Sequence, residues 1–507
     1  MKTLPPVLAL SLTAGAALAA DGLRIASWNI TNYGGGSAST IQNVVYGEFN
    51  GRKMDPDLFL LQEFASQSAL NAFVSALNSA AGSPGDWAGA TFVGGGGGGI
   101  NTCLAYRTSK LDLLDTTIVS LGSSSANPRN IIRYDLRLDG YQAEETVLAV
   151  YSLHMKAGSG SSDQSRRLIE ADKVRTDAEQ LPEGRNIIVG GDFNIQSAFQ
   201  AAYIELTGGQ QNDRGRVLDP IAAPGVWNNS FVYRNIHTQD PVGGGGMDDR
   251  LDQILLSPSL GDGIGLDYAG LFGVPWNLNT PEDPNHSYRC WGNDGTSFNQ
   301  RMTTTGNTMV GPSIAQSIIT MGGPTGHCPV YLDLVVPAKI EASTGVIDFG
   351  SVTQGDAAIA SIEVTNAADP AVWGTAGIQD LQYEFITTGG ISAATGVFFD
   401  EPGGTGIPHN ILADTSVVGP ISGTLVIASN DPDVPNLEFV ISGEVVAPAD
   451  CVADIAPPFG ILDLADINAF TTGFIAGDPI ADLAAPAGVF DLSDINAFVD
   501  SFAAGCP

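Results

Sequence analysis

Residues 186–194 read Asn-Ile-Ile-Val-Gly-Gly-Asp-Phe-Asn. The apolar, β-branched run from Asn186 to Val189 predicts a buried strand, and the two glycines after it allow close approach to a neighbouring segment. Asp192 and Asn194 then place a carboxylate and an amide on one side of the strand end. Such a pair suits a site that holds a water molecule and a phosphoryl oxygen at the same time.

Similar runs on both sides of this stretch predict the rest of the domain. Helices are predicted at Gln67 to Ala80 and Ser165 to Leu181, the second from apolar residues at near-helical spacing. Further strands are predicted at Leu23 to Trp28, Leu58 to Leu61, Thr102 to Tyr106, Val147 to Leu153, Leu251 to Leu256 and Pro329 to Val335. The mixture indicates an α/β domain over residues 21–337, with sandwiched sheets flanked by helices. Functional residues are expected in loops at its strand ends.

Two of these strands end in polar side chains. Asn29 follows Ala26-Ser27-Trp28, where a buried amide is costly unless it is paired. Glu63 ends the run that begins at Asp57. A carboxylate in that place is either an ion-pair partner or a ligand for a hard metal, because Mg²⁺ prefers oxygen and often takes only one or two protein carboxylates.

Two histidines complete the set. His154 and Lys156 are two residues apart and so share one face of a strand, although a structural role for the histidine stays an alternative. Asp252 comes from the run Arg250 to Ser257, and His327 precedes Cys328 and Pro329. An aspartate and a histidine from different strands can form a pair that fixes the imidazole tautomer.

These five motifs, in this order along residues 26–330, resemble those of the endonuclease/exonuclease/phosphatase family. The resemblance implies a four-layered α/β sandwich that hydrolyses phosphate esters with Mg²⁺ or Mn²⁺. It implies that Glu63 is the principal metal ligand with Asn29 beside it, and that Asn29 and Lys156 contact the substrate phosphate.

The resemblance also implies roles for the other motif residues. Asp192 and Asn194 would position the attacking water and the scissile phosphate. His327, oriented by Asp252, would act as a general base or as an electrostatic partner of the phosphate, and His154 would contact the phosphate or assist the leaving oxygen. The sequence departs from the family pattern at Gly326, where the family usually has an aspartate. Because that carboxylate could join a second metal site, a single metal anchored on Glu63 is expected.

The net charge of the chain, and where its Lys and Arg residues lie, are relevant to which substrates it can bind. The formal net charge of −33 argues against broad basic contact with nucleic acid. Since no Lys or Arg follows Lys339, a local positive site in the first domain stays open. The leading hypothesis is a nonspecific extracellular nuclease acting on DNA or RNA. The alternatives are a sphingomyelinase-like phospholipid hydrolase or other phosphoesterase, and a surface-attached binding or structural protein with a relict catalytic domain.

The N-terminus predicts export. Lys2, the apolar stretch Val7 to Leu12 and the triplet Ala17-Leu18-Ala19 are typical of a cleaved signal peptide over residues 1–20. The apolar stretch is short for a membrane anchor, so a secreted, extracellular or surface-associated protein with no integral membrane segment in its mature chain is expected. Export permits disulfides. The first candidate pair is Cys451 with Cys506, the second is Cys290 with Cys328, and Cys103 is expected to be a buried thiol.

Two modules are predicted after the first domain. Residues 340–447 are rich in Gly, Pro, Thr and β-branched residues with frequent turn signals, and resemble the Ig-like β-sandwiches that follow many secreted bacterial enzymes. Residues 450–507 are a duplication, since Asp466-Ile467-Asn468-Ala469-Phe470 recurs 28 positions later as Asp494-Ile495-Asn496-Ala497-Phe498. These modules suggest a cell-surface or matrix partner.

The duplicated segment resembles the paired calcium loops of dockerin-like modules. Its candidate calcium ligands are Asp454, Asp463, Asp466, Asp482, Asp491 and Asp494. It departs from the pattern because Ala456-Pro457-Pro458 and Ala484-Ala485-Pro486 stand where Asp and Asn would alternate. Weak Ca²⁺ binding is therefore one alternative, and a degenerate helix pair held by Cys451 and Cys506 is favoured.

Overall fold

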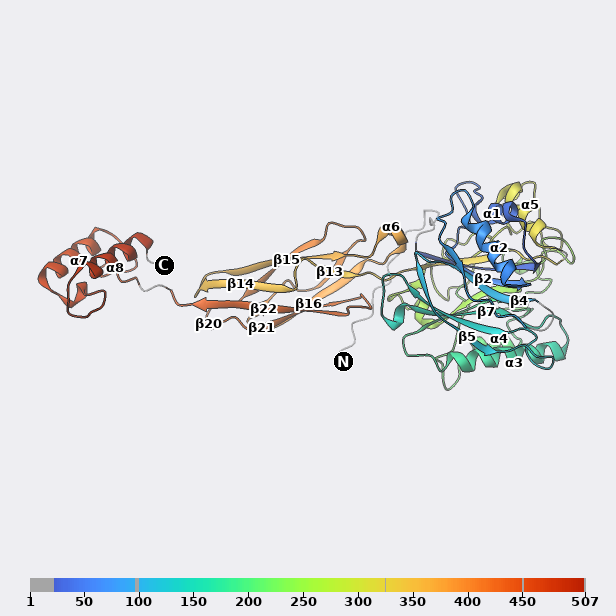
Figure 1. The fold of residues 1–507 in the computed structure, drawn as a ribbon, viewed down its shortest axis with the longest axis horizontal. Helices are drawn as coiled ribbons and strands as arrows, with labels where there is room; N and C mark the ends of the chain where they lie inside the picture. Colours follow the sequence, from blue (N-terminus) through green and yellow to red (C-terminus); the bar gives the residue numbers. More distant parts are fainter. Residues whose placement is uncertain (1–21, 96–99, 324, 449–450, 506–507) are drawn as a thin grey trace.

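The computed structural model describes residues 22–95, 100–323, 325–448 and 451–505. The predicted signal peptide, residues 1–20, lies outside these ranges. Figure 1 shows three parts in a row: a globular α/β part, an elongated β part and a pair of helices. Among the described helices, none has the length and apolarity that crossing a membrane requires.

The first sheet of the α/β part follows the order β10-β12-β1-β2-β4-β3, with β11 also paired to β12. Its central strands β1 and β2 are parallel and almost wholly buried, which explains their continuous apolar runs. The strands are β1 (Leu23–Tyr33), β2 (Leu58–Phe64), β3 (Trp87–Gly89), β4 (Asn101–Arg107), β10 (Asp267–Tyr268), β11 (Arg289–Cys290) and β12 (Val330–Val335).

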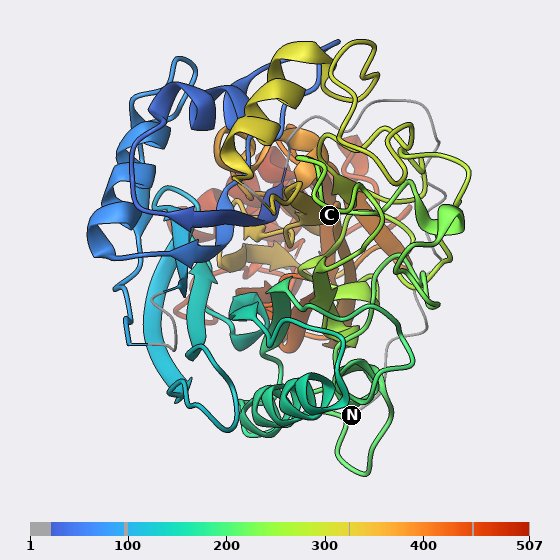
Figure 2. The same cartoon turned by 90° about the vertical axis from the view of Figure 1, so that its right-hand side faces the viewer.

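The second sheet has the order β5-β6-β7-β8-β9 and packs face to face with the first, through contacts such as β2 with β7 and β1 with β8. Its strands are β5 (Leu111–Ser120), β6 (Ile131–Leu138), β7 (Val147–His154), β8 (Asn186–Asp192) and β9 (Asp252–Leu256). Helices α1 (Ala38–Tyr46), α2 (Gln67–Asn78) and α5 (Gly311–Met321) lie outside the first sheet, and α3 (Ser161–Ala178) and α4 (Ala201–Thr207) lie outside the second (Figures 1 and 2). The predicted α/β domain is confirmed, and its layers run helix, sheet, sheet, helix.

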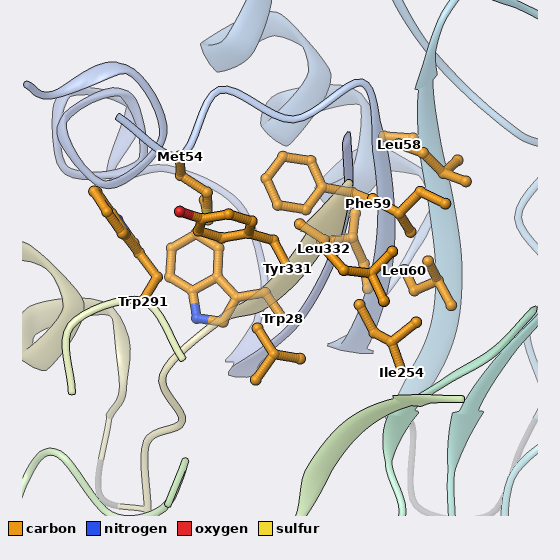
Figure 3. Packing of buried hydrophobic residues seen from close by; sticks show 14 of the residues in the cluster. Trp28, Met54, Leu58, Phe59, Leu60, Ile254, Trp291, Tyr331 and Leu332 are labelled. Carbon is orange, nitrogen blue, oxygen red and sulfur yellow. The ribbon is translucent and has the colours of Figure 1, made fainter. Parts of the chain in front are cut away.

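Alternation along β2 fixes which side chains enter each layer. Leu60 points toward the second sheet, where a Cβ on Gly190 would meet its Cδ2 at 2.9 Å. Phe59 points the other way, and its ring lies 5.4 Å from that of Phe73 on α2. Figure 3 shows Leu60 and Ile254 in this buried packing, with Trp28 and Tyr331 nearby. Close packing of these apolar side chains fixes the two sheets against each other, and so fixes the positions of their strand ends.

One cysteine prediction is wrong. Cys290 and Cys328 are both buried and free. Pairing of β11 with β12 sets Cys290 opposite Val330 rather than opposite Cys328, and the Cys290 thiol donates to the carbonyl oxygen of His237 at 2.8 Å. Cys103 is a buried free thiol, as predicted.

The middle part consists mostly of strands in two sheets, as its composition predicts. One sheet has the order β13-β15-β19-β17 and the other β14-β22-β21-β16-β18, with β20 also paired to β22. The elements are β13 (Ile340–Ala342), β14 (Val346–Thr353), β15 (Ala358–Asn366), α6 (Pro370–Trp373), β16 (Leu381–Gly389), β17 (Ile391–Ser392), β18 (Val397–Asp400), β19 (Ile407–Ala413), β20 (Gly419–Pro420), β21 (Gly423–Ser429) and β22 (Asn436–Val446). Asp433 joins this part to the α/β part by accepting hydrogen bonds from the backbone N–H groups of Gln142 and Ala143.

The C-terminal part is a helix pair, α7 (Leu464–Ala476) and α8 (Leu492–Ala504). The rings of Phe470 and Phe498, which are equivalent positions of the duplication, stack with centroids 4.2 Å apart. Cys451 is disulfide-bonded, and its predicted partner Cys506 lies outside the described residues.

The repeat aspartates bond mainly to backbone N–H groups. Asp466 accepts from Ile455, Ala456 and Asp463 at 2.9, 2.9 and 3.0 Å, and Asp494 accepts from the equivalent groups of the second copy. Among the described residues, neither copy gathers three carboxylates within 4.8 Å of one another. These contacts fit the predicted degenerate helix pair, while the buried Oδ1 atoms of Asp454 and Asp482 accept no hydrogen bond, so weak Ca²⁺ binding stays the alternative prediction.

We expect Asp494→Ala to lower the midpoint of the thermal transition of the helix pair, because three N–H groups lose their acceptor. The matched control is Asp500→Ala, which changes an exposed aspartate of the same helix. Calorimetry of the full chain, which resolves separate transitions, measures the effect. We expect Ca²⁺ or EDTA to leave the transition in place, and a Ca²⁺-dependent rise of the midpoint would contradict the metal-free interpretation.

Candidate active site

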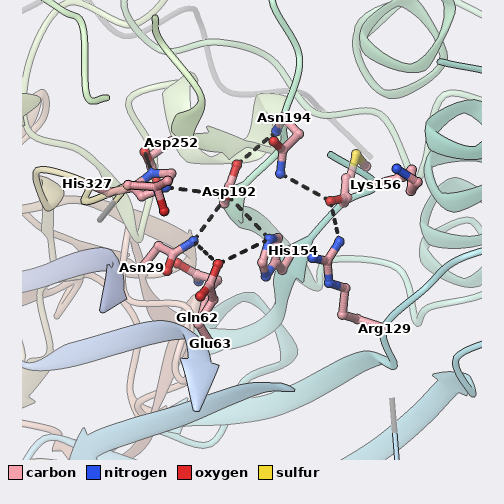
Figure 4. A network of polar contacts seen from close by, with 12 residues as sticks. Asn29, Gln62, Glu63, Arg129, His154, Lys156, Asp192, Asn194, Asp252 and His327 are labelled. Atoms are coloured by element: carbon pink, nitrogen blue, oxygen red, sulfur yellow. Dashed lines mark hydrogen bonds and ion pairs between the residues drawn. The ribbon is translucent and has the colours of Figure 1, made fainter. Parts of the chain in front are cut away.

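Strand ends from both sheets meet at one edge of the α/β part (Figure 4). In the second sheet, His154 of β7 is paired with Asp192 of β8, and Asp192 is paired with Asp252 of β9. From the first sheet come Asn29 and Glu63, and His327 lies just before β12. The predicted residues Asn29, Glu63, His154, Asp192, Asp252 and His327 therefore form one group, here called the catalytic cluster.

Gly191 brings β7 and β8 close together. Its φ is +141°, and a Cβ there would lie 2.0 Å from the carbonyl oxygen of Leu153. Only glycine fits this approach. The glycine before Asp192 therefore sets the aspartate directly beside His154.

A backbone irregularity turns Glu63 into the cluster. If the alternation of β2 continued, Glu63 would follow Phe59 toward the helix layer. Instead its φ is +66°, and the pairing of β2 with β4 shifts register between Leu61 and Phe64. Residues held in such sparsely populated conformations cluster at functional sites, and bulges there re-aim side chains.

Asn29 links the two carboxylates. Its Nδ2 donates to Glu63 Oε1 at 3.3 Å and to Asp192 Oδ2 at 3.2 Å, and its Oδ1 accepts from the N–H of Thr31 at 3.1 Å. Glu63 Oε2 accepts from the N–H of Asn32 at 2.8 Å. The buried amide predicted at the end of β1 is thus fully paired.

His327 is held as a cation by aspartates. Its Nδ1 lies 2.7 Å from Asp252 Oδ2, and its Nε2 lies 3.9 Å from Asp192 Oδ2. Burial alone would lower the pKa of His327, but the charge and hydrogen bond of Asp252, with the charges of Asp192 and Glu63, raise it to about 9. The predicted orienting pair is therefore present in the structure.

The pKa values of His154 and Asp192 are shifted in opposite directions. Burial, reinforced by the charges of Arg129 and His327, holds the pKa of His154 well below its usual range, so this imidazole is neutral at pH 7. Its Nε2 lies 3.5 Å from Asp192 Oδ2. Burial raises the pKa of Asp192 to about 7, against the lowering charge of His327. Titratable groups whose environments push their pKa values apart are candidates for acid and base roles.

Asn194 fixes one oxygen of Asp192. Its backbone N–H donates to Asp192 Oδ1 at 3.0 Å, while its side-chain Nδ2 donates to the carbonyl oxygen of Met155 at 3.2 Å. Asp192 Oδ2 is then the oxygen that faces Asn29 and both histidines.

The structure does not bring Lys156 into the cluster. Its ammonium pairs with Asp163 at 2.8 Å, and Figure 4 shows it pointing away from Asp192. Besides His327, a second cation near the carboxylates is Arg129. Its Nη1 donates to the carbonyl oxygen of Met155 at 2.9 Å, and the charges of Asp192 and Glu63 act on it. Sequence reasoning missed Arg129 because it lies in a loop with no strand or motif beside it.

The donor chemistry of the cluster fits a hard divalent cation. Glu63 and Asp192 share the amide of Asn29, so their carboxylates lie close together and largely buried. Oxygen ligands of this kind are those that Mg²⁺ prefers. A second group, Asp192, Asp252 and His327, has ligand atoms within 4.8 Å of one another, but the Nδ1 of His327 is already bonded to Asp252. Glu63 stays the predicted anchor for a metal.

Close packing explains why residue 326 is a glycine. A Cβ there would lie 2.4 Å from the Cα of Gly322, at the end of α5. An aspartate at this position would require the backbone of α5 to move. The departure from the family pattern therefore follows from how tightly this helix packs behind His327.

We expect Asp252→Asn to move the alkaline limb of the pH profile of kcat/KM to lower pH. Removing the Asp252 charge removes the largest influence that raises the pKa of His327 to about 9, so the imidazolium is lost earlier as pH rises. Steady-state kinetics from pH 6 to pH 10 on a small phosphodiester measure the limb. An unchanged limb would show that His327 is not the group that titrates there.

Comparisons with known proteins found a family model and several solved structures that resemble part of the chain. Residues 26–264 match the sequence model of the Endonuclease/Exonuclease/phosphatase family. Similar solved structures include an endonuclease/exonuclease/phosphatase from Bacteroides vulgatus, with 12% identity, 62% of this chain and 98% of the other covered, and a TM-score of 0.37. A mannosyl-6-phosphatase from Bacteroides thetaiotaomicron has 18% identity, 62% and 100% coverage and a TM-score of 0.36. The human Nocturnin catalytic domain has 15% identity, 62% and 94% coverage and a TM-score of 0.33.

No curated protein matches the chain. The family match spans β1 to β9 and so contains the stretch that supplies Asn29, Glu63, His154, Asp192 and Asp252, while His327 lies beyond it. Residues 26–264 are thus similar to the endonuclease/exonuclease/phosphatase family.

Proposed function

We propose that the α/β domain is a metal-dependent phosphodiesterase that is secreted and hydrolyses nucleic acid outside the cell. The observation that carries the proposal is the catalytic cluster, in which one aspartate lies between a neutral and a cationic histidine beside an oxygen-rich pair. The intact geometry of the cluster opposes the relict-domain alternative. The predicted signal peptide supports secretion.

The residues of the cluster divide the chemistry. Above pH about 7, Asp192 is ionised, and its Oδ2 can accept a proton from water as that water attacks phosphorus. His327 is protonated, so its Nε2–H can donate to a phosphate oxygen while Asp252 holds its Nδ1. Because of this raised pKa, the electrostatic role of His327 is favoured over that of a general base.

His154 and Glu63 are the other two groups of the catalytic cluster with a role in the reaction. His154 is neutral and can hydrogen-bond the phosphate or the leaving oxygen without adding charge. Glu63, with Asn29 beside it, would hold the divalent cation. When bound, that cation supplies positive charge that neutralises the phosphodiester anion.

The test is a substrate panel with the purified full chain: plasmid DNA, RNA, sphingomyelin vesicles and bis(p-nitrophenyl) phosphate. We expect cleavage of DNA or RNA that EDTA abolishes and Mg²⁺ or Mn²⁺ restores. Hydrolysis of sphingomyelin alone would select the phospholipid alternative, and hydrolysis of none of the four would reject the enzyme. A mature protein in the culture medium that begins near Asp21 would support secretion.

A further inference from the structure

Four exposed apolar side chains lie on the segment that follows β8 and on the segment at residues 226–232, which pairs with it. They are Phe199, Val226, Phe231 and Val232, with 71%, 54%, 59% and 54% of their surface exposed. We call them the apolar rim. Single exposed apolar residues are ordinary, but several together beside a site mark a binding surface.

Phe199 of the apolar rim follows Asp192 and Asn194 in the chain, and Val226 lies on the segment that pairs with it. Gln196, two residues after Asn194, accepts hydrogen bonds at its carbonyl oxygen from the N–H groups of Trp227 and Asn228, at 2.9 and 3.3 Å. The N–H of Ala198 donates to the carbonyl oxygen of Gly225 at 2.8 Å. Phe199 and Val226 are therefore carried by paired segments that start at the catalytic strand end.

The same segments also reach His327. The side chain of Asn228 donates to Asp249 Oδ1 at 2.9 Å, and the N–H of Gln239 donates to the carbonyl oxygen of Asp249 at 3.2 Å. The side-chain Nε2 of Gln239 lies 3.4 Å from Nε2 of His327. Asn228, between Val226 and Phe231 in the chain, is thus linked through Asp249 and Gln239 to a side chain that lies 3.4 Å from His327.

Phe231 is held in place yet exposed. Phe298 contacts its ring edge-on, with centroids 5.4 Å apart and an interplanar angle of 85°. The guanidinium of Arg234 lies 4.3 Å from the ring centroid and donates to the carbonyl oxygen of Phe231 rather than to a carboxylate. The ring is a fixed stacking surface with a cation against it.

Two further arginines outside the rim are bonded to carbonyl oxygens. Arg129 donates to the carbonyl oxygen of Met155, and Arg166 donates to that of Ala126 at 2.6 Å. In a chain of net charge −33, such cations bonded to uncharged oxygens stand out. A ligand that reaches Arg166 and Arg234 would meet two guanidinium groups bonded to carbonyl oxygens and, at Phe231, a flat apolar surface.

We propose that the apolar rim stacks unpaired nucleobases, so that the enzyme acts preferentially on single-stranded nucleic acid. This inference rests on the proposed nuclease function. Unpaired bases expose their faces to aromatic side chains, while a duplex hides them in its stack, and the backbone phosphates match the cations. A bilayer surface is the less suitable occupant, because Asn228 and Arg234 place polar groups between and beside the apolar ones.

The test compares Phe231→Ala with Phe231→Trp, and with the matched control Phe399→Ala, an exposed aromatic of β18. Substrates are a single-stranded oligonucleotide, its duplex and bis(p-nitrophenyl) phosphate. We expect the wild type to prefer the single strand. Loss of one stacked base should raise KM for the single strand about 5- to 150-fold in Phe231→Ala, with kcat on the small diester unchanged and Phe231→Trp near wild type.

Binding gives a second readout that does not need turnover. Fluorescence anisotropy with a labelled single strand, in EDTA, should show the same loss of affinity in Phe231→Ala. Wild-type nuclease activity with an unchanged KM and Kd in this variant would overturn the rim proposal alone. Equal losses on all three substrates would also overturn it. Failure of the proposed function itself would appear in the wild type, as no hydrolysis of any phosphoester.

Discussion

Asp192→Asn is expected to lower kcat for phosphodiester hydrolysis by about 10²- to 10⁴-fold, the usual loss when a positioned proton acceptor is removed. Asparagine keeps the size of the side chain, and its Oδ1 can still accept from the N–H of Asn194. What it loses is the oxygen Oδ2, which faces His154, His327 and Asn29 and is able to take a proton.

The same substitution is expected to leave the free energy of unfolding unchanged or to raise it at pH 8. Burial raises the folded-state pKa of Asp192 to about 7, above its ordinary value. A group raised in this way contributes stability below the unfolded pKa, and that contribution is lost as pH rises through the folded pKa. Above pH 7 the ionised carboxylate therefore costs stability, and asparagine removes that cost.

Kinetics on plasmid DNA and thermal unfolding in EDTA measure both halves of this prediction. The matched control is Asp172→Asn, an exposed aspartate of α3, which should change neither quantity. A variant with much lower stability and proportionally lower activity would assign Asp192 to folding rather than to catalysis. Activity within tenfold of wild type would remove Asp192 from the mechanism.

The sequence was informative where local pattern and side-chain chemistry coincide. Strands β2, β7 and β8 are apolar runs that end in Glu63, His154 and Asp192, so both the element and its terminal group can be predicted. The pair of Asp252 with His327 was predictable as a partnership because a buried imidazole needs an acceptor. Its 2.7 Å geometry was not, since the two residues are brought together by sheet packing.

Other features depend on tertiary contacts that leave no local signal. Arg129 is placed by a loop that bonds to Met155, and Lys156 pairs with Asp163, so the spacing of His154 and Lys156 did not indicate which cation lies near the carboxylates. Helix α5 lacks charged residues and was not predicted, yet its packing against Gly326 excludes a side chain there. The bulge at Glu63 is likewise invisible in an apolar run, although it directs the carboxylate.

Glu63→Gln is expected to abolish metal-dependent turnover, with a loss of about 10³-fold or more, because several kcal/mol of charge stabilisation depend on the cation that Glu63 would hold. Little stability should be lost. The Gln side-chain oxygen can still accept from the N–H of Asn32, the contact that Glu63 makes at 2.8 Å.

Metal binding provides a readout apart from activity. In the wild type, Mg²⁺ or Mn²⁺ at 100 times Kd should stabilise the folded domain by about 2.7 kcal/mol, visible as a rise in Tm that EDTA reverses. In Glu63→Gln that rise should disappear, while in the matched control Glu183→Gln, an exposed glutamate after α3, it should persist. If Glu63→Gln keeps the rise in Tm but loses turnover, the cation is held elsewhere, with Asp192, Asp252 and His327 as the remaining group. If it keeps both, Glu63 is needed neither for metal binding nor for turnover, and its assignment as the metal anchor is wrong.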